Sequence, residues 1–212
     1  MSDGMTQMTS LHEERLQHAT AVLKQTGARR ILDLGCGSGM LLYRLLAEEQ
    51  FTEILGVEQS GLSLAQARRM LDSHLSAAKP RLALLHGSYA VRNQKLVGFD
   101  AAAMIETIEH VAPGELSTVE RAVFANYRPG YVFMTTPNSE YNPLLGLHEG
   151  EFREEDHKFE WSRARFRLWA SGVARRNGYR VHFSGVGDPH PELGYPTQTA
   201  MFGRSGSDAA AA

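Results

Sequence analysis

The sequence predicts an α/β fold in which a mostly parallel sheet carries helices on both faces. Three observations lead to this prediction. Short apolar runs alternate with stretches of helical period, as in proteins built from strand–helix units. A glycine-rich turn, Gly35–Gly39, joins the first apolar run to the helix that follows it. The chain has 212 residues, which is enough for one such domain with its own core.

The first half of the chain begins with a helix over Leu11–Gln25, which has apolar residues on one face and Gly27 just beyond its end. Four apolar runs then predict strands, in this order: Arg30–Leu34, Glu53–Val57, Leu82–His86 and Phe99–Ile105. Helices are predicted between them, from Met40 to about Glu48 and from about Leu62 to Leu75.

The second half is broken at Pro113-Gly114 and loses its period between Pro137 and Trp161. Long irregular segments in compact domains are usually functional or disordered, and this one is rich in aromatic residues and histidine. We therefore expect an ordered, functional loop there. Around it the sequence predicts, in order, a helix over Glu115–Asn126, a strand over Tyr131–Thr135, a helix over Ser162–Asn177 and a final antiparallel strand pair over Tyr179–Gly185 and Thr197–Gly203.

Composition limits the classes of partner and compartment. The formal net charge is −2, so a nucleic acid would have to bind at a local patch or by one end. The single cysteine, Cys36, excludes an internal disulfide and fits a reducing compartment. The polar N-terminus lacks the apolar core of a signal peptide, and no apolar run is long enough to span a bilayer. We expect a cytoplasmic protein that does not interact with membranes.

The stretch Glu106–His110 places two carboxylates and an imidazole directly after the apolar run Ala101–Ile105. On a helix, positions i, i+3 and i+4 share one face, so Glu106, Glu109 and His110 would converge. Ligands bind beyond the carboxyl ends of strands in such folds, and these three groups suggest a metal ion. The alternative is an exposed acidic helix start, favoured by the helix dipole, and the stretch alone does not decide between them.

The glycine turn is preceded by Asp33, and Glu58 closes the next predicted strand. An acidic side chain at that position can accept hydrogen bonds from both hydroxyls of a ribose. The spacing is G-x-G-x-G rather than the G-x-G-x-x-G of dinucleotide sites, and Asp33 would repel a pyrophosphate. A cationic sulfonium or amino group would not be repelled. The alternative is a purely structural turn, in which Cys36 is a packing residue rather than a nucleophile.

These residues resemble the class I S-adenosylmethionine-dependent methyltransferases, whose first motif is similar to Leu32–Gly39, LDLGCGSG. Glu58 resembles the acidic residue that holds the adenosine ribose, and Gly87-Ser88 lies where that family contacts adenine. The resemblance implies a seven-stranded Rossmann-like sheet of order 3-2-1-4-5-7-6 with strand 7 antiparallel. It also implies a methyltransferase domain over residues 10–204, between a disordered N-terminus at 1–9 and a disordered tail at 205–212. The cofactor residues that it implies are Asp33, Gly35, Gly37, Gly39, Glu58 and Ser88.

A second resemblance lies in the irregular segment. Phe152–Arg163, together with Thr136-Pro137-Asn138 and Tyr141-Asn142-Pro143, is similar to RNA 3′-terminal ribose 2′-O-methyltransferases, which modify small silencing RNAs or act in bacterial RNA repair. In that family an E-x-x-E-H element and a histidine of D-H-x-F-E-W hold a divalent metal. The residues implied as ligands and catalytic groups are Glu106, Glu109, His110 and His157, with His148 as a fallback.

The implied chemistry begins with a metal that lowers the pKa of a ribose hydroxyl. A site that takes both hydroxyls of a terminal nucleotide selects RNA 3′ ends with a free 2′,3′-diol. The metal is then manganese or magnesium, and two histidine ligands favour manganese. His157 or His110 would take up the proton.

The tentative RNA contacts are Arg153, Lys158, Phe159, Trp161 and Arg163, because interleaved aromatic and basic residues can stack a terminal base and hold phosphates. For Phe159 and Trp161 the alternative is simple packing of the loop onto the sheet.

The resemblance does not decide whether the methyltransferase domain belongs to a larger protein. Larger bacterial members carry an N-terminal domain that engages an RNA-repair kinase–phosphatase–ligase partner. We expect this chain to be either a domain excised from such a protein or similar to the stand-alone eukaryotic catalytic module. Two other functions remain open: a metal-dependent, catechol-type small-molecule O-methyltransferase, and a non-catalytic module that binds RNA 3′ ends.

Overall fold

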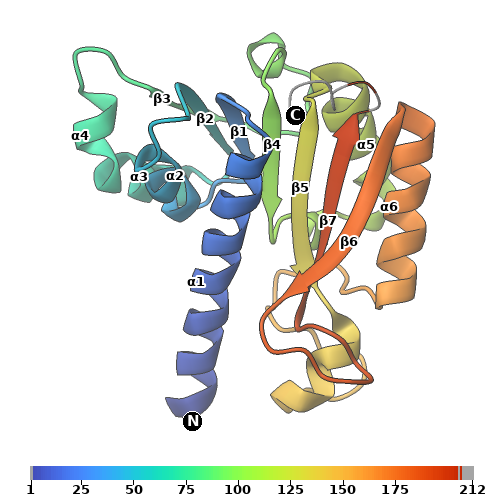
Figure 1. Cartoon of the computed structure of the whole chain (residues 1–212). Coiled ribbons are helices and arrows are strands. Elements are labelled where there is room, and N and C mark those ends of the chain that lie inside the picture. Colours follow the sequence, from blue (N-terminus) through green and yellow to red (C-terminus); the bar gives the residue numbers. More distant parts are fainter. Residues whose placement is uncertain (1, 205, 207–212) are drawn as a thin grey trace.

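The computed structural model describes residues 2–204 and 206, and its centre is a seven-stranded sheet of order β3-β2-β1-β4-β5-β7-β6 (Figure 1). The strands are β1 Arg30–Leu34, β2 Glu53–Glu58, β3 Leu82–His86, β4 Ala101–Ile105, β5 Tyr131–Pro137, β6 Tyr179–Val186 and β7 Thr197–Arg204. β7 runs antiparallel to its neighbours β5 and β6, and the pairs among β1 to β5 are parallel. The predicted strand order and the predicted antiparallel final pair are therefore confirmed.

The α-helices are α1 Ser2–Gln25, α2 Met40–Leu46, α3 Gly61–Met70, α4 Asp72–Leu75, α5 Leu116–Glu120 and α6 Arg163–Asn177. Shorter turns are η1 Gln94–Leu96, η2 Ile108–His110, η3 Pro113–Glu115 and η5 Ser139–Leu145, and the π-helical segment η4 Arg121–Tyr127 continues α5. The segment predicted to be irregular thus contains one 3₁₀ helix, η5. The helix predicted over 62–75 is split into α3 and α4 at Leu71.

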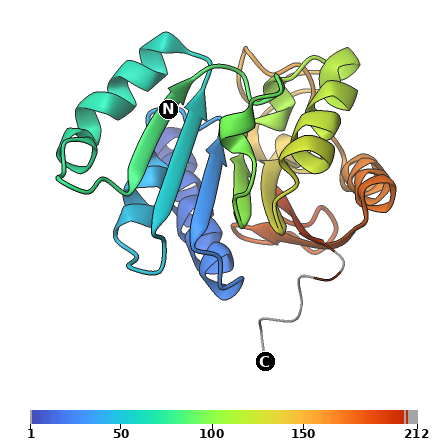
Figure 2. The same cartoon turned by 90° about the horizontal axis from the view of Figure 1, so that it is seen from above.

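Alternate residues of the strands supply two separate cores, because successive side chains of a strand point to opposite faces. Ile31 and Phe133 pack with α1 and α2 on one face, whereas Leu32 and Met104 pack with α5, η4 and α6 on the other. Figure 2 shows helices on both sides of the strands. The predicted covering of both faces is therefore confirmed.

Helix α1 packs on one face of the sheet, and Arg15, near its middle, lies 3.1 Å from Glu106, just after the C-terminal end of β4 (Figure 1). It begins at Ser2, although the helix was predicted to begin at Leu11 and residues 1–9 to be disordered. Residues 2–10 contain no proline, the residue that most strongly breaks a helix, so the helix can continue there. Residue 1 and most of the predicted tail, 205 and 207–212, lie outside the described residues. Among the helices that are described, none has the length and apolar character that a bilayer span requires.

Candidate functional site

The glycine loop links the ends of three strands. It connects β1 to α2, and Gly35 and Gly37 have φ values of +83° and +53°, which other residues rarely adopt. A Cβ on Gly35 would lie 2.6 Å from Cγ2 of Thr107, so the loop packs directly on the turn that follows β4. The backbone N–H of Gly37 donates to Oε2 of Glu58, at the end of β2, over 2.9 Å. Gly39 then directly precedes α2.

Asp33 and Glu58 place two carboxylates beside this loop. Asp33 is 2% exposed, and its Oδ2 has no hydrogen-bond partner. Burial, and then the charge of Glu58, raise the pKa of Asp33 to about 7. A buried acceptor of this kind fits a cationic donor group. Cys36 is also buried, and burial raises the pKa of its thiol, which fits the predicted packing role rather than a nucleophile.

One cavity of about 630 Å³ extends from the glycine loop to the turn after β4. It is within the usual size range of small-molecule sites. Residues predicted to bind the cofactor and residues predicted to bind the metal line it together, including Gly35, Gly37, Glu58, Ser88, Glu106 and His110. The cavity therefore extends from the predicted cofactor residues to Glu106 and His110 of the predicted metal ligands, whereas Glu109 and His157 are not in its lining.

Three of the four predicted metal ligands converge. One ligand atom from each of Glu109, His110 and His157 lies within 4.8 Å of the other two. The backbone N–H of Lys158 donates to the carbonyl of Glu109 over 2.7 Å, which holds the irregular segment against η2. Oε2 of Glu109 accepts from the hydroxyl of Thr136 at 2.9 Å, but its buried Oε1 has no partner. Burial, and then the charge of Glu106, raise the pKa of Glu109. An unpartnered buried carboxylate oxygen beside two imidazoles fits a divalent cation.

Each of the two imidazoles is held by a carboxylate. Nδ1 of His110 lies 3.1 Å from Asp156, and Nδ1 of His157 lies 2.7 Å from Oε1 of Glu160. The rings meet edge to face, with centroids 4.8 Å apart. A carboxylate on Nδ1 fixes the proton there and leaves Nε2 with its lone pair, as in histidines that bind metals through Nε2.

Glu106 does not lie on a common helix face with Glu109 and His110, which corrects the prediction. It has a φ of +50°, and its backbone N–H donates to the carbonyl and the hydroxyl of Thr135. The pairing of β4 with β5 thus extends past Ile105, and only Ile108–His110 form a helical turn. The carboxylate of Glu106 lies 3.1 Å from Arg15 of α1 and accepts from the Thr135 hydroxyl at 2.8 Å. It therefore lines the cavity but stands outside the ligand cluster.

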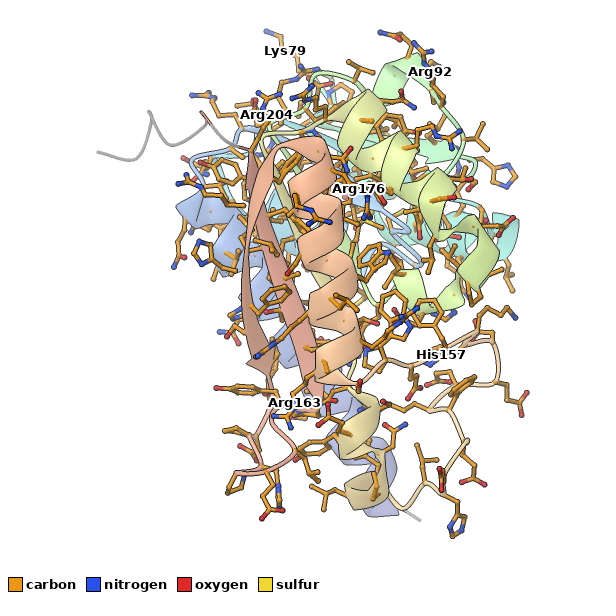
Figure 3. All side chains as sticks on the ribbon, turned by 90° about the vertical axis from the view of Figure 1, so that its right-hand side faces the viewer. Lys79, Arg92, His157, Arg163, Arg176 and Arg204 are labelled. Atoms are coloured by element: carbon orange, nitrogen blue, oxygen red, sulfur yellow. The ribbon has the colours of Figure 1, made fainter. Side chains whose placement is uncertain are left out.

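Phe159 and Trp161 lie in the core, with exposures of 8% and 9%, and stack on each other at 4.2 Å. This burial favours the packing alternative over contact with a base. Nε and Nη2 of Arg163 both donate to Oε2 of Glu140, and Figure 3 shows His157 and Arg163 near the same end of α6. The side chains of Arg163 and Glu140 are both only partly buried.

The remaining predicted RNA contacts and the fallback metal ligand differ in whether their side chains are exposed to a ligand. The guanidinium of Arg153 is largely buried and donates to the Asn142 side chain and the Asn138 carbonyl. Lys158 is exposed and free to approach a phosphate. His148, the fallback ligand, is exposed and lies outside the cluster.

Sequence reasoning missed three functional candidates: Arg15, Asp156 and Glu160. Arg15 is 91 positions from Glu106 in the chain, and no local pattern marks it. Asp156 and Glu160 stand in the same motif as His157. Their positions on either side of His157 in the sequence were the signal that could have identified them.

Comparisons with known proteins agree on the type of domain. A family model described as a methyltransferase domain matches residues 32–130. The solved methyltransferase domain of a bacterial Hen1, CtHen1-C, is 39% identical with a TM-score of 0.83, over 92% of this chain and 98% of that one. The solved small RNA methyltransferase HEN1 is 34% identical with a TM-score of 0.85, over 92% of this chain and 25% of that one. The small RNA 2′-O-methyltransferase of Mus musculus is 36% identical over 205 residues, which cover 92% of this chain and 51% of that protein. The chain thus spans about half the length of this curated relative.

Proposed function

The chain belongs to the Hen1 family of small RNA 2′-O-methyltransferases, and on this premise we propose that it methylates the 2′-hydroxyl of the 3′-terminal nucleotide of an RNA, with S-adenosylmethionine as donor and a divalent metal as cofactor. One observation carries the proposal. Glu109, His110 and His157 form the metal-type cluster, and a single cavity is lined by both the glycine loop and the turn after β4, which carries Glu109 and His110. A donor and an acceptor bound at its two ends would share that space.

The donor end would use the residues of β1, β2 and the glycine loop. Glu58 would accept the ribose hydroxyls, since its carboxylate is held in place by the N–H groups of Gly37 and Ser60. The unpartnered Oδ2 of Asp33 would offset the positive charge of the donor. Ser88 lies on the wall where adenine would be contacted. Methyl transfer requires this cationic donor, which supplies the methyl group from its sulfonium.

The acceptor end would use Glu109, His110 and His157 to hold the metal, with Glu106 as a fourth ligand once it leaves Arg15. A divalent cation lowers the pKa of a hydroxyl that coordinates it, which is what a ribose hydroxyl needs near neutral pH. Two imidazoles among the ligands favour manganese over magnesium.

Proton uptake by His110 or His157 conflicts with their role as ligands. Nδ1 of each ring faces a carboxylate, so the proton stays on that atom. If Nε2 coordinates the metal, neither nitrogen has a lone pair left for a proton. We therefore assign both rings to holding the metal and assign proton removal to neither.

A methyl-transfer assay tests the proposal against the two alternatives. Tritiated S-adenosylmethionine and Mn²⁺ would be supplied with an RNA ending in a 2′,3′-diol, the same RNA with a 3′-phosphate, or a catechol. We expect label on the diol RNA alone. Label on catechol alone would indicate a small-molecule enzyme, and binding of the diol RNA without label would indicate a non-catalytic module. Label on the 3′-phosphate RNA would contradict recognition of both hydroxyls.

Other expectations remain predictions from the resemblance. A cytoplasmic location would be checked by fractionation of the source cells. An RNA-repair kinase–phosphatase partner would be sought by co-purification from the same cells. The domain limits 10 and 204 would be checked by limited proteolysis.

A further inference from the structure

A second cavity, of about 480 Å³, lies at the C-terminal ends of β5 and β6. Its lining comes mainly from three segments: residues 10–14 of α1, the helix η5 with its C-terminal end, and the connection from β6 to β7. The apolar part of the lining is Leu11 from α1 and Tyr141, Leu144, Leu145 and Leu147 from η5 and its end. The hydroxyl of Tyr141 donates to the carbonyl of Asp188 over 3.1 Å, which fixes the ring between two of the walls.

Two of these walls connect to residues that surround the metal-type cluster. Glu14 lines the cavity, and the next residue, Arg15, lies 3.1 Å from Glu106. Arg153 also lines the cavity, and its backbone N–H donates to Oε1 of Glu160, which holds Nδ1 of His157. Through Arg15 and Glu160 the lining of this second cavity is therefore linked to Glu106 and His157, at the edge of the sheet where the parallel strands end.

The charges of this cavity favour a neutral occupant. Glu14 and Asp188 bring carboxylates to its lining, whereas the guanidinium of Arg153 already lies 3.9 Å from Glu160 and donates to Asn138 and Asn142. A phosphate would meet the two carboxylates without a free cation to balance them. A flat, neutral nucleobase would instead find apolar walls and the ring of Tyr141, and base stacking tolerates any base.

We propose that this second cavity binds the base of the 3′-terminal nucleotide while its ribose lies at the metal-type cluster. The inference rests on the proposed function, because it assumes that the ligand is an RNA end. It places the base contact on Tyr141 and Leu144, rather than on the core residues Phe159 and Trp161. Because no fixed set of donors and acceptors is needed for stacking, all four terminal bases would be accepted.

The test is equilibrium binding of two fluorescent RNAs at a fixed Mn²⁺ concentration. One ends in an ordinary nucleotide and the other in an abasic ribose, and both keep the 2′,3′-diol. For the unmodified protein we expect loss of the base to raise Kd about tenfold, within the range of a stacked base. In Tyr141→Ala and in Leu144→Ala the ratio of the two Kd values should fall toward one. Leu144 is 51% exposed, so its truncation leaves folding intact, which a thermal melt would verify.

Leu168→Ala is the matched control, because Leu168 is 69% exposed on α6 and does not line the cavity. It should keep the tenfold ratio. A ratio near one in the unmodified protein, an unchanged ratio in both cavity variants, or no binding of either RNA would overturn the inference. Methyl transfer measured in the same samples separates the two claims: an RNA that binds with the expected ratio but takes no label would contradict the proposed function alone.

Discussion

Replacing Glu160 with glutamine tests how the site orients His157. Glu160 has no exposed side-chain surface, and its Oε1 accepts from Nδ1 of His157 at 2.7 Å. The same carboxylate accepts from the side chain of Asn142 at 2.6 Å and from the backbone of Arg153 at 2.7 Å. Glutamine keeps the shape of the side chain but removes its charge and turns one acceptor into a donor. The imidazole then loses the partner that makes Nε2 a strong ligand.

The expected loss of metal affinity depends on how deeply the carboxylate behind each histidine is buried. Loss of a carboxylate behind a histidine ligand typically lowers metal affinity about 10- to 100-fold, and we expect Glu160→Gln to fall within this range. Asp156 makes the corresponding contact with His110, but its side chain is 73% exposed. Exposed ion pairs contribute about 0–1 kcal/mol, so Asp156→Asn should lower the affinity no more than about fivefold.

Calorimetric titration of the protein with Mn²⁺ measures both affinities directly. Glu154→Gln, an exposed change in the same segment, serves as the control and should leave the affinity unchanged. A thermal melt of each variant would separate loss of the site from loss of the fold. Equal affinities for Glu160→Gln and the unmodified protein, or a larger loss in Asp156→Asn, would refute this account of the histidine pair.

Three further variants test the two ends of the cavity. Glu58→Ala should weaken S-adenosylmethionine binding at least tenfold while Mn²⁺ affinity changes little, and titration with each ligand would check this; equal losses would argue against separate sites. Asp33→Asn should raise the Tm of the cofactor-free protein at pH 8 but not at pH 4. The reason is that the folded protein keeps its Asp33 proton up to a pKa of about 7, against an ordinary value of 3.8, so this carboxylate increasingly disfavours folding as the pH rises through that window. Melts at the two pH values measure the difference, and an equal gain at both would contradict it. Glu109→Gln should likewise raise the Tm of the metal-free protein, because burial raises the pKa of Glu109, and it should abolish detectable Mn²⁺ binding. A lower Tm with Mn²⁺ affinity intact would contradict that prediction.

Strands β2 to β5 were predictable because they are mainly apolar runs between clear breaks. β1 and β3 begin and end where the sequence predicts them, and the glycine loop and Glu58 occupy the predicted ends of β1 and β2. The order of the strands followed from the family resemblance, because local periodicity does not encode which strands become neighbours.

The geometry of Glu106 was not predictable from its spacing to Glu109 and His110. Helical spacing is a local rule, but here the backbone N–H of Glu106 donates a hydrogen bond to Thr135 on the neighbouring strand. Its carboxylate is likewise paired with Arg15, from the far end of the chain. Both contacts depend on tertiary structure, and this is also why the burial of Phe159 and Trp161 could be offered only as an alternative.

Methylation of the 2′-oxygen at the RNA 3′ end is tested most directly by the resistance of the product to periodate. Periodate cleaves a free 2′,3′-diol at an RNA end, and a methyl group on the 2′-oxygen prevents that cleavage. After incubation with tritiated S-adenosylmethionine and Mn²⁺, the labelled RNA should keep its full length through periodate oxidation followed by β-elimination, and His157→Ala should yield no such product. Labelled RNA that oxidation and β-elimination still shorten by one nucleotide would carry its methyl group elsewhere than on the terminal 2′-oxygen, and would contradict the proposed function.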